Sequence, residues 1–288
     1  MTATQIYRFR RDNVDDLALL RAWRLNPHVR EGSVALSELA ERLEQEEMPM
    51  PRRDPFRGHR FPKDVILLAV RWYCRYPLSY RDVRDLLAER GISIDAATVY
   101  RWVQKFGPEI RKRAYGRHRS WRGLTWHVDE TYLRVNGRWC YLWRVVDQHG
   151  RLIDFRLTAR RTAGAARAFL RQARETVRLY QPLTIITDKA HSYAKVIGAW
   201  NARLGPDDAI RHITKKHLNN RIEGDHSVLK HRLRPMRGLQ GLSSAKATLK
   251  GVETFRAIRR GDFYACEAGV PNEIRFVRNL FEDGRKAA

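Results

Sequence analysis

Between residues 124 and 158, three runs rich in β-branched and aromatic residues follow one another with only short turns between them. The first run, LTWHVDETYLRV, ends at Asn136-Gly137, which is a strong two-residue hairpin signal. The second run, RWCYLWRVVD, precedes a turn at His149-Gly150, and the third run reads RLIDFRLTA. This order predicts an antiparallel meander of three strands, so the fold of this region must be built around a sheet.

The pattern after the meander alternates between helix and strand. A helix is expected from Thr162, where apolar residues recur on one face, followed by the short buried strand PLTIITD. The helix SYAKVIGAW, the strand IRHIT and the helix NNRIEGDHSVLKHRL complete the order. Three strands, helix, strand, helix, strand, helix is the order of the ribonuclease H fold. The predicted fold class is therefore α/β, a ribonuclease-H-like mixed sheet preceded by an all-α domain.

That all-α domain is expected over residues 55–110. Ser79 and Asp82 have the spacing of a capping box, and Gly91 is suited to end the helix that follows Ser79. Two short helices joined by a turn with glycine form a helix-turn-helix pattern, whose second helix enters the major groove. The residues near the start of that helix are then the candidates for reading DNA bases: Thr98, Tyr100 and Arg101. An ordinary three-helix bundle is the alternative.

The chain divides into five predicted segments. Residues 1–48 contain two short amphipathic helix patterns and end before a proline-rich linker. Residues 111–123 form a basic connector between the helical domain and a catalytic domain at 124–240. This connector is expected either to be a solvated link or to follow DNA phosphates. A helical extension is expected at 241–288.

The formal net charge of +24 is unevenly distributed. Residues 1–50 hold 7 basic and 9 acidic side chains, whereas residues 51–123 hold 18 and 7, and residues 124–288 hold 31 and 16. An excess of this size favours a polyanion as partner, with a ribosome-associated role as the alternative to DNA. Three scattered cysteines and the lack of a long apolar run are typical of a cytoplasmic protein with no membrane span.

Three acids have positions that suit metal-dependent chemistry. Asp129 lies within the first strand, Asp188 ends the fourth, and Glu223 lies in the first turn of a late helix. The first and fourth strands are neighbours in this fold, so the three carboxylates are expected to converge. Such oxygens suit two Mg²⁺ or Mn²⁺ ions per site, as in phosphodiester displacement. Taken singly, each acid has an ordinary structural explanation, and Asp147 is assigned to turn chemistry.

Three blocks of the chain make the comparison with a known family specific: HVDETYLRVNGRWCYLWRVVDQHG, ITDKAHSYAKVI and HLNNRIEGDHSVLKHRLRPMRGLQGL. They resemble the catalytic blocks of bacterial DDE transposases of insertion-sequence family six. The likeness runs from about Pro55 to about Arg260. It includes the interval of 34 residues between Asp188 and Glu223, and a basic residue, Lys230, seven positions after the glutamate.

The resemblance implies a DNA transposase that binds terminal inverted repeats, cleaves the element's ends to 3′-hydroxyls and joins them to target DNA. It also implies catalytic roles for Asp129, Asp188, Glu223 and Lys230, double-stranded DNA as partner, and a homodimer. The chain departs from the family at His191-Ser192, where proline is common, and at Gly224, where alanine is common. The alternatives are a catalytically inert DNA-binding regulator and a structure-specific nuclease. Residues 1–48 are interpreted as an oligomerisation or regulatory appendage, with docking on the chain's own core or an added DNA contact as alternatives.

Overall fold

The computed structural model describes residues 54–115, 117, 124–177, 182–188, 191–205, 209–214, 220–236 and 239–282. The helices predicted within residues 1–48 lie outside these ranges. Residues 54–59 belong to a unit with the N-terminal segment, and the described residues from Arg60 onward belong to a second compact unit. The elements that position the candidate site all lie in this second unit.

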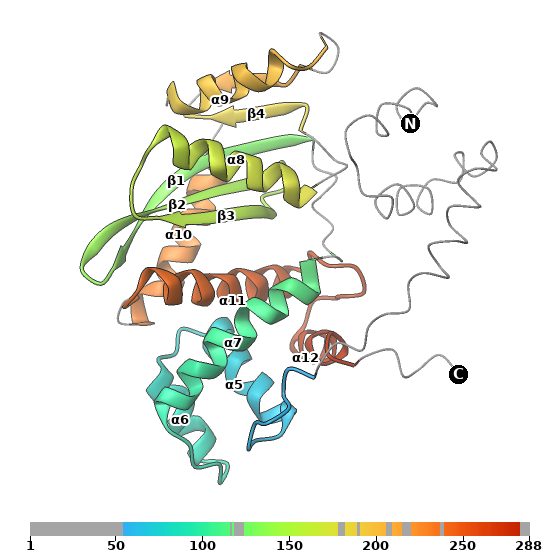
Figure 1. The fold of residues 1–288 in the computed structure, drawn as a ribbon. Coiled ribbons are helices and arrows are strands. Elements are labelled where there is room, and N and C mark those ends of the chain that lie inside the picture. The colour runs from blue at the N-terminus through green and yellow to red at the C-terminus, as the bar shows by residue number, and fades with distance from the viewer. Residues whose placement is uncertain are drawn as a thin grey trace, which may run out of the picture. The chain divides into compact units, whose positions relative to one another are not determined.

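A mixed five-stranded sheet forms the centre of this unit (Figure 1). Its strands are β1 (Thr125–Val135), β2 (Arg138–Asp147), β3 (Leu152–Thr158), β4 (Thr184–Thr187) and β5 (Arg211–Thr214). They lie in the order β3-β2-β1-β4-β5, with β1, β2 and β3 antiparallel and β4 and β5 parallel to β1. The predicted meander and the predicted neighbourhood of the first and fourth strands are both confirmed.

The turns of the meander follow from local chemistry. Asn136 and Gly137 both have positive φ, 47° and 74°, as the favoured two-residue hairpin turn requires. At the next turn, Asp147 Oδ1 accepts hydrogen bonds from the backbone N–H groups of His149 and Arg151, each at 2.8 Å. The assignment of Asp147 to turn chemistry is confirmed.

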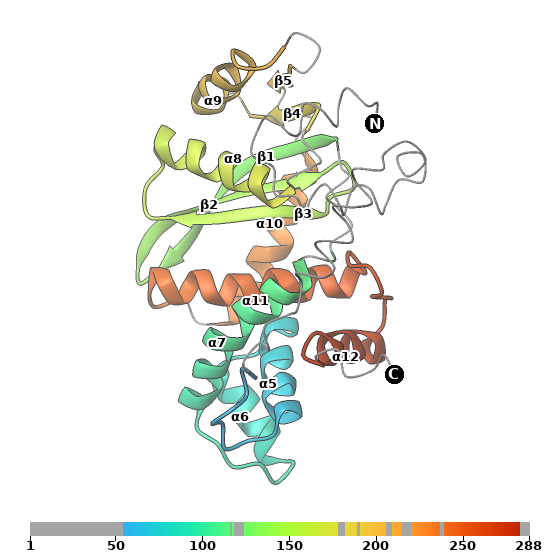
Figure 2. The same cartoon turned by 45° about the vertical axis from the view of Figure 1, so that its right-hand side comes forward.

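Helices cover both faces of the sheet (Figures 1 and 2). On one face, α8 (Ala163–Val177) and α9 (His191–Asn201) pack over a core that includes Trp126, Val128 and Trp143. On the other face, α10 (Asn220–Leu233) contacts β1 and β2. Successive side chains along a strand point to opposite faces of the sheet. Two neighbouring residues of β1 therefore face different surroundings, one the apolar core and the other α10.

Three helices precede the sheet: α5 (Lys63–Arg75), α6 (Tyr80–Ala88) and α7 (Ala96–Tyr115). The predicted capping box is present, with the Ser79 hydroxyl accepting from the Asp82 N–H and the Asp82 carboxylate accepting from the Ser79 N–H. Helix α7 is longer than the sequence predicts, because it continues past Phe106 to Tyr115. The added turns bury Ala114, so part of the predicted basic connector is a packed helix.

Helix α11 (Leu242–Arg260) lies between the three N-terminal helices and the sheet, contacting α5, α7 and β3 (Figure 2). Its approach to α7 is close because glycines face each other: a Cβ on Gly251 would lie 3.3 Å from Gly107 Cα and 2.7 Å from Cys74 Sγ. The short 3₁₀ turn η4 (Arg234–Met236) follows α10, and α12 (Val270–Asn279) packs against α5 and α11. The region predicted as a C-terminal extension therefore joins the N-terminal helices to the sheet.

None of the helices within the ranges that the structure describes is long and apolar enough to span a bilayer.

Candidate active site

The first candidate ligand, Asp129, is directed by the alternation of β1. Trp126 and Val128 are fully buried in the core under α8 and α9, so Asp129 belongs to the opposite face. In the register of the two strands, Asp129 lies opposite Arg144 of β2, and α10 contacts both strands. Asp129 thus lies on the sheet face that α10 covers.

Asp188 reaches Asp129 through the parallel pairing of β1 and β4. The register pairs Val128 with Thr187, and Asp188 is the next residue after Thr187. Continuing this register by one residue brings Asp188 beside Asp129, at the spacing of neighbouring strands, about 4.8 Å. The Asp188 charge acts on Asp129, and the predicted convergence of these two acids is therefore consistent with the sheet.

Helix α10 supplies the other predicted residues. Glu223 lies in its first turn and Lys230 in its last, seven residues or two turns apart, so both share one helix face. Asp129, Glu223 and Lys230 line the same cavity, which has a volume of about 590 Å³. The structure therefore brings three of the four predicted catalytic residues to one cavity, with Asp188 at the adjacent strand end.

The electrostatics of Asp129 are unusual for an aspartate. Burial, together with the nearby carboxylates of Glu130, Asp188 and Glu223, raises the pKa of Asp129 to about 7. Within the part of the chain that the structure describes, no lysine or arginine forms an ion pair with it. Asp129 thus lies among acids that raise its pKa, with no ion pair to a described lysine or arginine to lower it.

His226 is a residue of this site that the sequence interpretation missed. Its Nδ1 lies 3.8 Å from Asp129 Oδ2, and it lines the same cavity as Glu223 and Lys230. Burial, helped by the charges of Arg144 and Lys230, lowers the pKa of His226 to about 3. The imidazole is therefore neutral and does not balance Asp129. The signal that could have found it is its spacing of three residues from Glu223 on one helix.

Glu130, the neighbour of Asp129, borders the carboxylate cavity, but its carboxylate has partners on the opposite face of the sheet. It points to the other face, where the Tyr193 hydroxyl donates to its carboxylate at 2.6 Å and Arg161 forms an ion pair with it. Burial raises the pKa of Glu130, while Tyr193 and Arg161 oppose that rise. This acid has its hydrogen-bond and charge partners within the chain.

A buried ion-pair network fixes α10 on the sheet. Arg144, fully buried on β2, pairs with Asp225 of α10 and with Glu253 of α11. Arg256 of α11 pairs with the same two carboxylates, at 2.6 Å from Asp225 and 3.0 Å from Glu253. Because Asp225 is only two residues from Glu223, the network helps to set the position of the first turn of α10.

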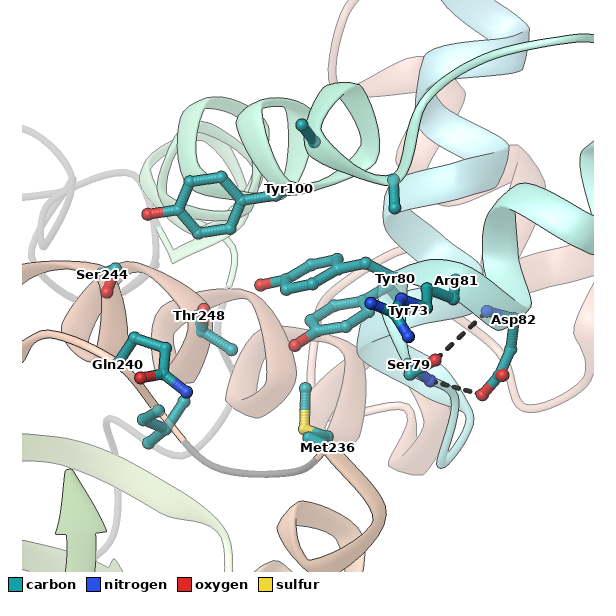
Figure 3. A pocket seen from close by; sticks show the side chains of 13 residues that line it. Tyr73, Ser79, Tyr80, Arg81, Asp82, Tyr100, Met236, Gln240, Ser244 and Thr248 are labelled. Carbon is teal, nitrogen blue, oxygen red and sulfur yellow. Dashed lines mark hydrogen bonds between the residues drawn. The ribbon is translucent and has the colours of Figure 1, made fainter. Parts of the chain in front are cut away.

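The predicted DNA-reading residues lie at the start of α7. Arg101 is exposed, Thr98 is half-buried, and Tyr100 is 40% exposed. Tyr100 lines a groove with a volume of about 750 Å³. Figure 3 shows Tyr100 across this groove from Ser244 of α11. The rings of Tyr73 and Tyr80, which line the same groove, are stacked with their centroids 4.1 Å apart. This groove shares no lining residue with the carboxylate cavity, so these residues form a separate region.

The carboxylate site has the donor chemistry of a hard divalent cation. Its candidate ligands provide only oxygen atoms, and the raised pKa of Asp129 reflects burial among acids that a cation would offset. Among the described residues, no group of three or more Asp, Glu, His or Cys side chains is close enough together to hold a metal ion as the side chains are placed. Glu223 is exposed and lines the same cavity as Asp129. The residues therefore fit such an ion, with closure of the side chains around it.

A mixed sheet in the order β3-β2-β1-β4-β5, with acids on β1, after β4 and on the helix that covers β1, defines a ribonuclease-H-like core of the DDE type. Residues 123–262 match the family model described as a DDE domain. The class of protein is therefore that of the DDE transposases, enzymes that cut and join DNA.

Relatives of the chain narrow the class. Over 207 residues it is 41% identical to the transposase for insertion sequence-like element IS431mec of Staphylococcus aureus, covering 70% of this chain and 88% of that protein. The same identity and coverage hold for the transposase for insertion sequence element IS257 in transposon Tn4003, also of Staphylococcus aureus. The chain belongs to this family of insertion-sequence transposases, family six, as its catalytic blocks predict.

Solved structures give weaker similarities. The catalytic core domain of HTLV-2 integrase is 19% identical, with a TM-score of 0.34 over 46% of this chain and 87% of that one. The catalytic core domain of BIV integrase is 15% identical, with a TM-score of 0.35 over 55% and 95%. Similarities at this level carry no argument about function.

Proposed function

We propose that this transposase binds the terminal inverted repeats of an insertion sequence, hydrolyses the element's ends to 3′-hydroxyls and joins these to target DNA. The observation that supports this most strongly is the cavity shared by Asp129, Glu223 and Lys230, with Asp188 at the neighbouring strand end. Acids gathered beside a lysine suit a reaction at a phosphodiester, whose own charge must be balanced.

Asp129, Asp188 and Glu223 would hold two Mg²⁺ or Mn²⁺ ions. When bound, two such ions stabilise the attacking and leaving oxygens of an in-line phosphodiester displacement. The neutral His226 would leave the carboxylate charge available to them, because it adds no positive charge beside Asp129.

Lys230 would hold the terminal DNA phosphate, since its ammonium is a compact charge on the wall of the same cavity. In the first step, water attacks the phosphorus at the element's end and the bond to the terminal 3′ oxygen breaks. In the second step, that 3′-hydroxyl attacks the phosphorus of a target phosphodiester. The bond from this phosphorus to the target's 3′ oxygen breaks, so the element's end is joined and a target 3′-hydroxyl is released. Each step exchanges one phosphoester bond for another bond to phosphorus, so no external energy source is needed.

Helices α6 and α7 would act as a helix-turn-helix that reads the repeat through Thr98, Tyr100 and Arg101. The N-terminal part of α7 is accessible, with Arg101 exposed and Tyr100 beside an open groove. Arg101→Ala is expected to cost about 1–3 kcal/mol of binding to the repeat if Arg101 meets a guanine edge. Gel shifts with repeat and scrambled duplexes measure this, and equal losses on both would make Arg101 a phosphate contact.

A homodimer is part of the proposal, because two element ends must be processed together. Residues 1–48 would contribute an oligomerisation surface. Light scattering on the chain without residues 1–48, with and without repeat DNA, measures this. A monomer that still binds one repeat supports the role, whereas an unchanged dimer with weakened DNA binding contradicts it.

A strand-transfer assay tests the reaction. The full chain is incubated with a duplex ending in the element's repeat, a target plasmid and Mg²⁺, and joined products are expected. Asp188→Ala should retain repeat binding and lose both cleavage and joining. Binding without cleavage by the wild-type chain would indicate an inert regulator, and cleavage without need for a repeat or any joining would indicate a nuclease.

A further inference from the structure

A second cavity lies on the side of α10 that faces away from the carboxylates. It has a volume of about 420 Å³ and takes its α10 lining from Gly224, Asp225, Val228 and Arg232. The carboxylate cavity takes its lining from Glu223, His226, Ser227 and Lys230. Because successive helix residues are turned by about 100°, these two sets lie on opposite sides of α10. One helix thus separates two cavities of different chemistry.

Arginines dominate the lining of this second cavity, which we call the arginine cavity. They come from α5, α10 and the end of α11: Arg75, Arg232, Arg256, Arg259 and Arg260. Three of them have carboxylate partners, since Arg75 pairs with Glu273 at 2.9 Å, Arg256 with Asp225, and Arg260 with Asp262 at 3.1 Å. Asp225 is the one acid in the lining.

Arg232 is a buried arginine of this lining whose donors are only partly used by the described residues. It is 8% exposed, and its Nη2 donates to the backbone carbonyl of Tyr73. Its Nε and Nη1 have no hydrogen-bond partner among the described residues. Burial lowers the pKa of Arg232, as expected for a cation removed from water. A buried guanidinium with two unused donors is costly unless an anion from outside the chain satisfies it.

Arg259 gives the cavity a second available cation at its surface. It is exposed in the last turn of α11 and forms no ion pair within the described part of the chain. Arg232 thus lines the inside of the cavity, and Arg259 adds a charge at its edge. Guanidinium groups offer paired N–H donors that match the oxygens of a phosphate group, and they do so better than lysine.

We propose that the arginine cavity binds a backbone phosphate of DNA, through Arg232 and Arg259. This inference rests on the proposed DNA substrate. The bound phosphate belongs to a part of the duplex other than the phosphodiester being cut, because α10 separates the arginine cavity from Lys230 and the carboxylates. The contact is independent of sequence, since a phosphate is common to every nucleotide.

The main experiment compares DNA binding by the full chain and its Arg259 variants, measured by fluorescence anisotropy without divalent metal. Arg259→Ala should weaken binding to repeat and scrambled duplexes alike, on the order of tenfold at low salt. The slope of log affinity against log salt should fall by about 0.9, the value for one lost phosphate contact. Arg167→Ala, which removes an exposed arginine on α8, is the matched control and should change affinity less than about twofold.

A methylphosphonate scan identifies the phosphate. Each phosphate of the repeat duplex is replaced in turn by a neutral methylphosphonate. At one position the replacement should weaken wild-type binding but cause no further loss in Arg259→Ala. Arg232→Lys keeps the charge and removes the paired donors. Its DNA binding should therefore be less affected than that of wild type by the methylphosphonate at the same position. Because Arg259 is exposed, its variant decides the question even where Arg232→Lys does not fold.

The outcomes separate this inference from the proposed function. A wild-type chain that binds no DNA would contradict the proposed function itself. Wild-type binding with the affinity, salt slope and methylphosphonate pattern unchanged in Arg259→Ala would overturn the arginine cavity as a DNA contact. Stabilisation of wild type, but not of Arg259→Ala, by inorganic phosphate with DNA binding unchanged would assign the cavity to a free phosphate and also overturn the proposal.

Discussion

Asp129 and Glu130 are adjacent in β1, yet the two faces of the sheet give them opposite surroundings. On the α8 and α9 face, Glu130 has the Tyr193 hydroxyl and the Arg161 guanidinium as partners. On the α10 face, Asp129 has a neutral histidine at 3.8 Å and the charges of other acids. Glu130 therefore holds β1 to the helices on its face, whereas Asp129, which has no ion pair to a described lysine or arginine, is the acid suited to an external cation.

The α10 face itself contains both kinds of acid. Asp225 and Glu253 are both buried, but Arg144 and Arg256 pair with them. Two residues before Asp225, Glu223 is exposed and faces the carboxylate cavity. A firmly paired network thus supports the helix that presents an exposed acid to the carboxylate cavity.

The largest expected difference in activity is between variants of Asp129 and of Glu130, the two neighbouring acids in β1. Asp129→Asn should abolish cleavage and joining while leaving repeat binding nearly intact, because it removes a ligand charge without removing volume. Glu130→Gln should keep detectable joining and cost about 1–3 kcal/mol of unfolding free energy, since it weakens charged hydrogen bonds. Strand-transfer assays and urea unfolding of both variants measure this. Loss of chemistry in Glu130→Gln with full activity in Asp129→Asn would reverse our assignment.

The buried network should show the next largest effect. Arg144→Met leaves Asp225 and Glu253 buried with fewer partners, and the expected cost is about 3–5 kcal/mol of unfolding free energy. Arg171→Met, which removes an exposed pair with Glu175, should cost no more than about 0.5 kcal/mol. Urea denaturation of the two variants makes the comparison. Similar small losses in both would mean that the network does not support α10.

The contact of α11 with α7 should show an intermediate effect. Gly251→Ala places a Cβ 2.7 Å from Cys74 Sγ and 3.3 Å from Gly107 Cα, so the helices must separate, at a cost of about 1–3 kcal/mol. Gly198→Ala in α9 meets no atom within 4 Å and should stabilise the chain by up to about 1 kcal/mol. Thermal unfolding distinguishes the two. A neutral Gly251→Ala would show that α11 does not pack as closely as the structure has it.

A dependence of stability on pH is expected from Glu253. Burial alone would raise its pKa, but Arg144 and Arg256 lower the pKa of Glu253 to about 2. A carboxyl whose pKa falls on folding contributes stability above its unfolded pKa, about 4.5, and that contribution is lost as pH falls toward 2. Wild type should therefore lose more stability across this window than Glu253→Gln does. Parallel curves for the two proteins would contradict the assigned pairing.

Much of the fold and of the site follows from local pattern. Alternating residues, the Asn136-Gly137 turn, the Ser79 capping box and the helical spacing of Glu223 and Lys230 each depend on residues close in sequence. Local steric and hydrogen-bonding preferences decide such features, so one sequence suffices to predict them. The same signals placed Asp129 within a strand and Asp188 at a strand end, as observed.

Tertiary structure decided what depends on partners far apart in the chain. Helix α7 continues to Tyr115 because Arg111 meets Asp154 and Ile110 is buried, neither of which a basic run reveals. Likewise, only packing shows that His226 is neutral beside Asp129, and that Arg144 joins three elements. Burial and the nearness of other charges set these properties. Both depend on the folded arrangement of residues that can be a hundred or more positions apart.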